Sequence, residues 1–155
     1  MTATAFDWDD RYLVGHGVID ATHREFADLL AVLLATDDDG LAAALDALTH
    51  HAEAHFALEE QLMERYAFPP RECHTDEHQR VLASVREVGA LLAEGDFAVA
   101  RELADALADW FPGHCDYMDS ALAIWVVKKT MQGAPVVLRR LKPPIDHLAH
   151  APAAA

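Results

Sequence analysis

The sequence is poor in basic residues, in cysteine and in long apolar runs. Its 155 residues include 12 Lys and Arg against 26 Asp and Glu, which gives a net charge of −14 at pH 7. Nucleic acid is therefore not an expected partner, because no basic stripe is present to neutralise phosphates. Two cysteines, Cys73 and Cys115, are too few for a disulfide framework. No apolar run reaches the roughly 20 residues of a membrane span, and no signal peptide is visible, so a cytoplasmic protein is expected.

The charge is distributed unevenly along the chain. Residues 1–127 carry seven basic and 25 acidic residues, a net of −18, whereas residues 128–155 carry five basic residues and one acidic residue, a net of +4. Gly133, Pro135 and the pair Pro143-Pro144 are typical of irregular chain. We therefore predict one domain over residues 1–130 and a C-terminal tail, docked or flexible, over residues 131–155. The basic tail is a candidate contact for an acidic protein partner, and a monomer is expected.

Strand signals are nearly absent, and apolar residues recur at helical spacing in four blocks. Asp20 is the expected N-cap of the first helix, and Pro112-Gly113 interrupts the fourth block. Short turns between long helices favour an all-α, antiparallel, up-down-up-down four-helix bundle. An extended N-terminal segment is expected to pack across it through Trp8 and Val14. The four expected helices cover residues 20–36, 41–66, 71–93 and 97–129.

Polar residues occupy inward positions of all four blocks, where a bundle core normally has leucine or alanine. A buried polar group costs several kcal/mol unless it is paired. A single core histidine is usually a hydrogen-bonded structural residue, but a metal satisfies a whole set of them at once. The inward polar residues are His23, His55, Glu59, His74, His78 and His114.

The spacing of these residues supports metal binding, and their number predicts two ions, because five imidazoles and two carboxylates exceed the six ligands of one octahedral ion. His55 and Glu59 are four residues apart and therefore share one helix face. The same holds for the two histidines of the third block. Imidazole with carboxylate suits iron, zinc, copper or nickel. A second carboxylate must come from the fourth block, from Asp116 or Asp119. A straight helix places Asp119 about 140° around from His114, whereas a widened turn near Pro112-Gly113 would swing it inward. The spacing leaves both aspartates open.

Several motifs together resemble those of the bacterial hemerythrins over roughly residues 6–125. The matching pieces are Trp8 with Val14-Gly15, Ile19-Asp20-Ala-Thr-His23, His55-Phe56-x-x-Glu59-Glu60-x-x-Met63, His74-x-x-x-His78 and Trp110-x-x-x-His114-x-x-x-x-Asp119.

The resemblance selects Asp119 over Asp116 and implies a non-heme di-iron centre. One iron would be held by three histidines and the other by two, the second keeping an open position. Two carboxylates and a solvent-derived oxo or hydroxo group would bridge them. The implied ligands are His74, His78 and His114 for the first iron, His23 and His55 for the second, and Glu59 and Asp119 as bridges.

The implied activity is reversible dioxygen binding, for oxygen storage, delivery or sensing, rather than catalysis. The alternative is a di-iron redox enzyme, a peroxidase, an oxidase or a nitric-oxide-handling protein, if the pocket admits water. Cys115 stands where the family commonly has an aliphatic residue, and it is either a small hydrophobe or an oxidisable thiol. The expected oxygen pocket consists of Phe26, Phe56, Trp110 and Phe111, with Cys115 behind His114.

Overall fold

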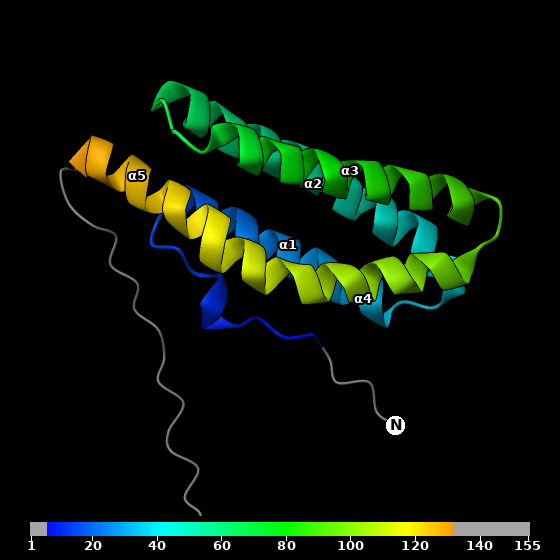
Figure 1. The fold of residues 1–155 in the computed structure, drawn as a ribbon. Coiled ribbons are helices and arrows are strands. Elements are labelled where there is room, and N and C mark those ends of the chain that lie inside the picture. Colours follow the sequence, from blue (N-terminus) through cyan, green and yellow to red (C-terminus); the bar gives the residue numbers. More distant parts are fainter. Residues whose placement is uncertain (1–5, 132–155) are drawn as a thin grey trace, which may run out of the picture.

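The computed structural model of the chain describes residues 6–131 and contains no strand within that range. The main helices are α1 (Gly17–Ala35), α2 (Leu41–Arg65), α3 (Arg71–Ala93), α4 (Phe97–His114) and α5 (Ser120–Met131), with short helical turns η1 (Asp10–Tyr12) and η2 (Asp38–Gly40). A π-helical turn, η3 (Cys115–Asp119), joins α4 to α5, so the two form one column (Figure 1). The predicted all-α four-helix bundle is confirmed. The predicted tail lies outside the described residues apart from its first position, and that boundary stays a prediction.

The first helix begins at Gly17, three residues before the predicted N-cap Asp20. The ring of His16 caps it instead, accepting from the backbone N–H of Ile19 at 3.4 Å. The carboxylate of Asp20 accepts from the backbone N–H groups of Val14 and Gly15, at 2.7 and 3.2 Å. Asp20 therefore fastens the N-terminal segment to α1 rather than starting the helix.

The N-terminal segment packs on the bundle as the sequence predicts. Tyr12 and Val14 are buried, and Trp8 packs against the core from a partly buried position. Arg24 lies over the Trp8 ring at 4.2 Å, a cation–π contact that further fixes the segment on α1.

Three apolar clusters make up the core of the described residues, and two of them are large. One includes Leu33, Leu48 and Leu103, and the other includes Ile19 and Leu122. On α1 and α2, the inward polar residues fall between members of these two clusters in sequence, between Ile19 and Phe26 on α1 and between Leu48 and Met63 on α2. Packed apolar side chains therefore flank the polar layer toward both ends of the bundle. None of the helices within residues 6–131 combines the length and the apolar character needed to cross a membrane.

The π-helical turn decides which aspartate of the fourth column points inward. The backbone N–H of Ser120 bonds to the carbonyl of Cys115, five residues earlier, so this turn holds one residue more than an α-turn. Asp119 is consequently fully buried, whereas Asp116 is exposed. The sequence predicts a widened turn at Pro112-Gly113, and it lies slightly later, immediately after His114.

Candidate metal centre

Seven polar side chains meet in the middle of the bundle, and none is more than 4% exposed. Every helical column supplies at least one of them. They are the seven residues that the sequence analysis singles out, namely His23 on α1, His55 and Glu59 on α2, His74 and His78 on α3, His114 at the end of α4 and Asp119 at the end of η3.

The side chains form two groups, each able to hold a metal ion. Within each group, one potential ligand atom per residue lies within 4.8 Å of all the others. The two groups share both carboxylates. The larger group is Glu59, His74, His78, His114 and Asp119, and the smaller is His23, His55, Glu59 and Asp119.

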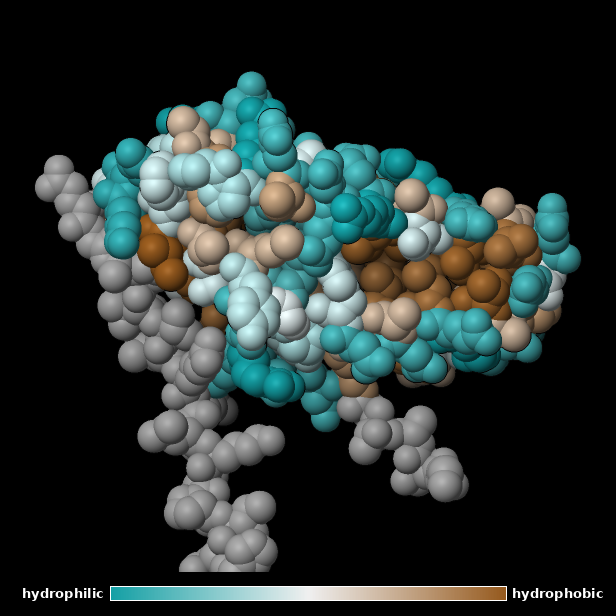
Figure 2. Space-filling model, in the orientation of Figure 1, coloured by the Kyte–Doolittle hydropathy of each residue, from teal (hydrophilic) through white to brown (hydrophobic). Residues whose placement is uncertain are grey.

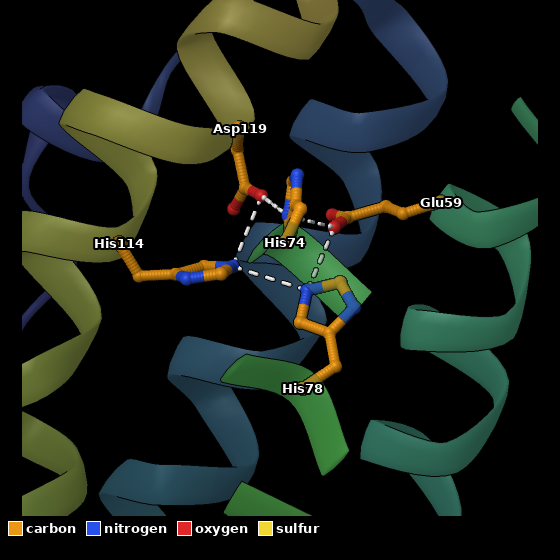
Figure 3. A group of neighbouring side chains, drawn as sticks. All are labelled: Glu59, His74, His78, His114 and Asp119. Carbon is orange, nitrogen blue, oxygen red and sulfur yellow. Dashed lines mark hydrogen bonds and ion pairs between the residues drawn. The ribbon is translucent and has the colours of Figure 1, made fainter. Parts of the chain in front are cut away.

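In the larger group, the imidazole Nε2 atoms converge on one oxygen of each carboxylate (Figure 3). Asp119 Oδ1 lies 3.0 Å from His74 Nε2 and 3.1 Å from His114 Nε2. Glu59 Oε2 lies 3.2 Å from His78 Nε2 and 3.3 Å from His74 Nε2. The nitrogens of His78 and His114 are themselves 3.2 Å apart. Five potential metal-ligating atoms thus lie close together.

In the smaller group, the other oxygen of each carboxylate is engaged. Asp119 Oδ2 lies 2.8 Å from His23 Nε2, and Glu59 Oε1 lies 2.8 Å from His55 Nε2. Each carboxylate therefore presents one oxygen to each group of histidines. This is the arrangement that a carboxylate needs in order to bridge two ions.

Hydrogen bonding among these residues leaves several buried atoms without a partner. Within residues 6–131, His74 Nε2, Glu59 Oε2 and Asp119 Oδ1 make no hydrogen bond, although His74 Nε2 lies 3.3 Å from the Glu59 oxygen and 3.0 Å from the Asp119 oxygen. The imidazole nitrogen is close enough to both oxygens for a hydrogen bond, but the angles are unsuitable. Buried polar atoms are rarely left without a partner. A metal ion bound between these atoms would supply the partner that hydrogen bonding does not. The imidazole and carboxylate donors suit a transition metal such as iron.

In the metal-free centre, buried imidazoles and carboxylates shift one another's pKa values. Burial alone would raise the pKa values of Glu59 and Asp119, but the surrounding histidines hold both below their ordinary values. Burial opposes protonation of His74, yet the neighbouring carboxylates of Asp119 and Glu59 raise its pKa to about 9. A metal ion entering this site must therefore displace protons.

The predicted pocket residues line both groups, and Phe56 contacts both, since its ring centroid also lies 5.3 Å from that of His55. Phe111 and Phe26 lie by the smaller group, with ring centroids 5.5 Å from His23 and 6.2 Å from His55, respectively. Phe56 stacks on His78 of the larger group at 3.9 Å, and Trp110 lies 4.5 Å from His114. Aromatic rings thus wall both groups, and the smaller group lies beside the pair of Phe26 and Phe111.

Cys115 is fully buried, with Sγ 3.7 Å from His23 Nδ1. Burial raises the pKa of its thiol to about 11. The thiolate is the reactive form, so this environment favours the interpretation of Cys115 as a small hydrophobe. Cys73, in contrast, is exposed.

Two contacts that support the histidines were not predicted from the sequence. The backbone carbonyl of Tyr12 accepts from His23 Nδ1 at 2.7 Å, and Glu77 Oε1 lies 3.1 Å from His114 Nδ1. The only sequence signal for Glu77 is its place directly before His78. Nothing in the order of residues brings it to His114, which lies on the neighbouring helix.

Comparison with known proteins agrees with this geometry. A family model described as the hemerythrin HHE cation binding domain matches residues 14–125. The chain is 38% identical to a bacteriohemerythrin of Ralstonia nicotianae over 122 residues, 79% of this chain and 89% of the relative. It is 29% identical to a bacteriohemerythrin of Stenotrophomonas maltophilia over 120 residues, 75% of this chain and 78% of that relative. The chain belongs to the hemerythrin family.

Proposed function

We propose that this protein binds dioxygen reversibly at a non-heme di-iron centre, for oxygen storage, delivery or sensing. The observation that carries the proposal is the division of the two carboxylates. Glu59 and Asp119 each direct one oxygen toward the group that contains His74, His78 and His114, and the other oxygen toward the group that contains His23 and His55. Two ions would thus be held together by shared anionic ligands but with unequal numbers of imidazoles.

The unequal donor count supports an assignment of ligands. His74, His78 and His114 would hold one iron, and His23 and His55 would hold the other. Glu59, Asp119 and an oxo or hydroxo group of solvent origin would bridge them. Because six ligands complete an octahedron, the ion with two histidines keeps an open position. When bound, the pair of ferrous ions supplies the electrons that reversible dioxygen binding requires.

The apolar residues beside His23 and His55 would protect that position. Phe26 and Phe111 are each about 1% exposed, and their ring centroids lie 4.6 Å apart. Packed aromatic rings exclude the water and protons that would otherwise discharge bound oxygen. This wall supports a carrier or sensor over the alternative, a di-iron redox enzyme, which needs access for a reductant or a substrate.

An optical cycle tests this function. We expect iron-loaded, reduced protein to develop a visible absorption band when oxygen is admitted and to lose the band when oxygen is removed under vacuum. The cycle should repeat without loss of amplitude, and metal-free protein should show no band. A band that decays at once to a stable oxidised spectrum would instead favour the redox enzyme.

Three further expectations remain part of this proposal. The protein is expected in the cytoplasm and as a monomer, and a protein partner is expected to contact the basic C-terminal segment. Residues 132–155 lie outside the part of the chain that the structure describes. The partner is therefore predicted from the charge of the sequence alone.

A further inference from the structure

One carboxylate outside the two donor groups contacts a donor histidine from behind. Glu77 on α3 has one oxygen, Oε1, that accepts from Trp110 Nε1 at 2.7 Å and lies 3.1 Å from His114 Nδ1. An ionised carboxylate only accepts hydrogen bonds. The proton at this contact therefore belongs to His114 Nδ1, which leaves the Nε2 atom of the same ring to face the centre.

This support distinguishes His114 from the other rings of the larger group. The Nδ1 atoms of His74 and His78 have no hydrogen-bond partner within the described range, and neither does that of His55 in the smaller group. His23 is held by a backbone carbonyl rather than by a charged group. Among the five histidines, and within residues 6–131, only His114 is backed by a carboxylate outside the centre.

Glu77 also fixes the residue that packs on His114. The Trp110 ring lies 4.5 Å from the His114 ring with an interplanar angle of 30°. The same Glu77 oxygen holds the indole N–H, so one side chain sets the position of both rings. His114 stands directly before the π-helical turn, where the backbone departs from regular α-helical hydrogen bonding.

The contact lies at the end of a surface groove. The groove, with a volume of about 310 Å³, runs between α3 and α4 and is lined by Val81, Leu103, Leu107, Trp110 and Glu77, among others. Figure 2 shows apolar side chains gathered where α3 and α4 run side by side in Figure 1. The Glu77 side chain is 28% exposed. Burial acts to raise its pKa, but hydrogen bonds from Trp110 and His114 outweigh this and hold the pKa below its ordinary value.

We propose that Glu77 is a positioning residue that fixes the tautomer and orientation of His114 and strengthens it as a metal ligand. The proposal rests on the proposed function, because it takes His114 to be a ligand. Carboxylates that hold the second nitrogen of a ligating histidine typically contribute about 10- to 100-fold in metal affinity.

The test compares Glu77→Gln and Glu77→Ala with Glu87→Gln, an exposed glutamate on the same helix. Ferrous ion is titrated without air in competition with a coloured chelator. We expect affinity to fall about 10- to 100-fold in Glu77→Ala. Glu77→Gln should lose less, because its amide oxygen still accepts, and Glu87→Gln should match the original protein. Equal affinities in all four proteins would overturn the proposal, as would a smaller loss in Glu77→Ala than in Glu77→Gln.

A second readout needs no metal. In the metal-free protein, the indole N–H resonance of Trp110, assigned with Trp110→Phe, should shift in both Glu77 variants and not in Glu87→Gln. An unmoved resonance would show that Glu77 does not hold Trp110 and would overturn the proposal. If the original protein failed to bind two iron ions, the proposed function would fall, whereas the resonance would still report whether the Glu77 contact exists. Should Glu77→Ala not fold, Glu77→Gln carries both comparisons.

Discussion

Glu59→Gln is expected to reduce the iron bound per chain from two ions to fewer than one. Glu59 presents Oε2 to His74 and His78 and Oε1 to His55. An amide has nearly the same volume as a carboxylate but carries no charge, and its nitrogen cannot act as a ligand. The substitution would therefore remove an anionic ligand from both ions of the proposed centre at once. Metal analysis after anaerobic loading and desalting measures the loss.

Glu60→Gln is the matched control for this experiment. Glu60 is the next residue on α2 and is partly exposed, whereas Glu59 is fully buried. The control should keep two ions per chain, and both variants should keep the helical circular dichroism of the parent. Two tightly held ions in folded Glu59→Gln would show that Glu59 does not bridge the ions.

The metal-free protein is expected to lose stability as the pH rises from about 6.5 to above 9. In the folded chain, the pKa of His74 is raised to about 9 by Asp119 and Glu59, against the opposing effect of burial. A group whose pKa is raised by folding stabilises fully below its unfolded pKa, about 6.5. That stabilisation disappears as the pH rises through the folded value. For His74 it is on the order of 3 kcal/mol, which chemical denaturation at pH 6.5, 8 and 9.5 would detect.

The acidic side of the profile has the opposite sign. The pKa values of Glu59 and Asp119 are lowered in the folded chain, because neighbouring histidines outweigh the effect of burial. Their stabilisation is present above the unfolded pKa, about 4, and is lost as the pH falls below it. Metal-free protein should thus be most stable between about pH 5 and 6.5. Stability that is flat or increasing from pH 6.5 to 9.5 would contradict this electrostatic description.

Bound metal should stabilise the protein more as the pH rises, whereas the metal-free protein loses stability. Metal binding requires imidazoles without protons at the ligating nitrogen and releases the protons that the metal-free centre holds. Affinity therefore rises with pH over the range in which the metal-free protein weakens. The difference in melting temperature between metal-loaded and metal-free protein should widen from pH 6.5 to 9.

The sequence predicts the helices and the polar layer well because both depend on local spacing. Apolar residues at helical intervals identify the four columns, and the i,i+4 pairs His55/Glu59 and His74/His78 place their side chains on common faces. The seven inward residues are all buried together in the structure. These features follow from periodicity and from the cost of burying polar groups without partners.

Features that depend on tertiary contacts were not predictable in the same way. The choice between Asp116 and Asp119 needs the location of the π-helical turn, which falls after His114 rather than at Pro112-Gly113. Glu77 reaches His114 only because α3 and α4 are neighbours in this register. Aspartate is a common N-cap residue, but Asp20 instead accepts hydrogen bonds from the backbone N–H groups of residues 14 and 15.

The most direct measurement is a crystal structure of the iron-loaded protein with anomalous differences collected on both sides of the iron absorption edge. We expect two iron peaks in the middle of the bundle, about 3.5–4 Å apart as in other two-metal sites. One peak should lie among His74, His78 and His114, the other beside His23 and His55, with Glu59 and Asp119 between them. A single peak, or a peak away from these residues, would contradict the proposed di-iron centre.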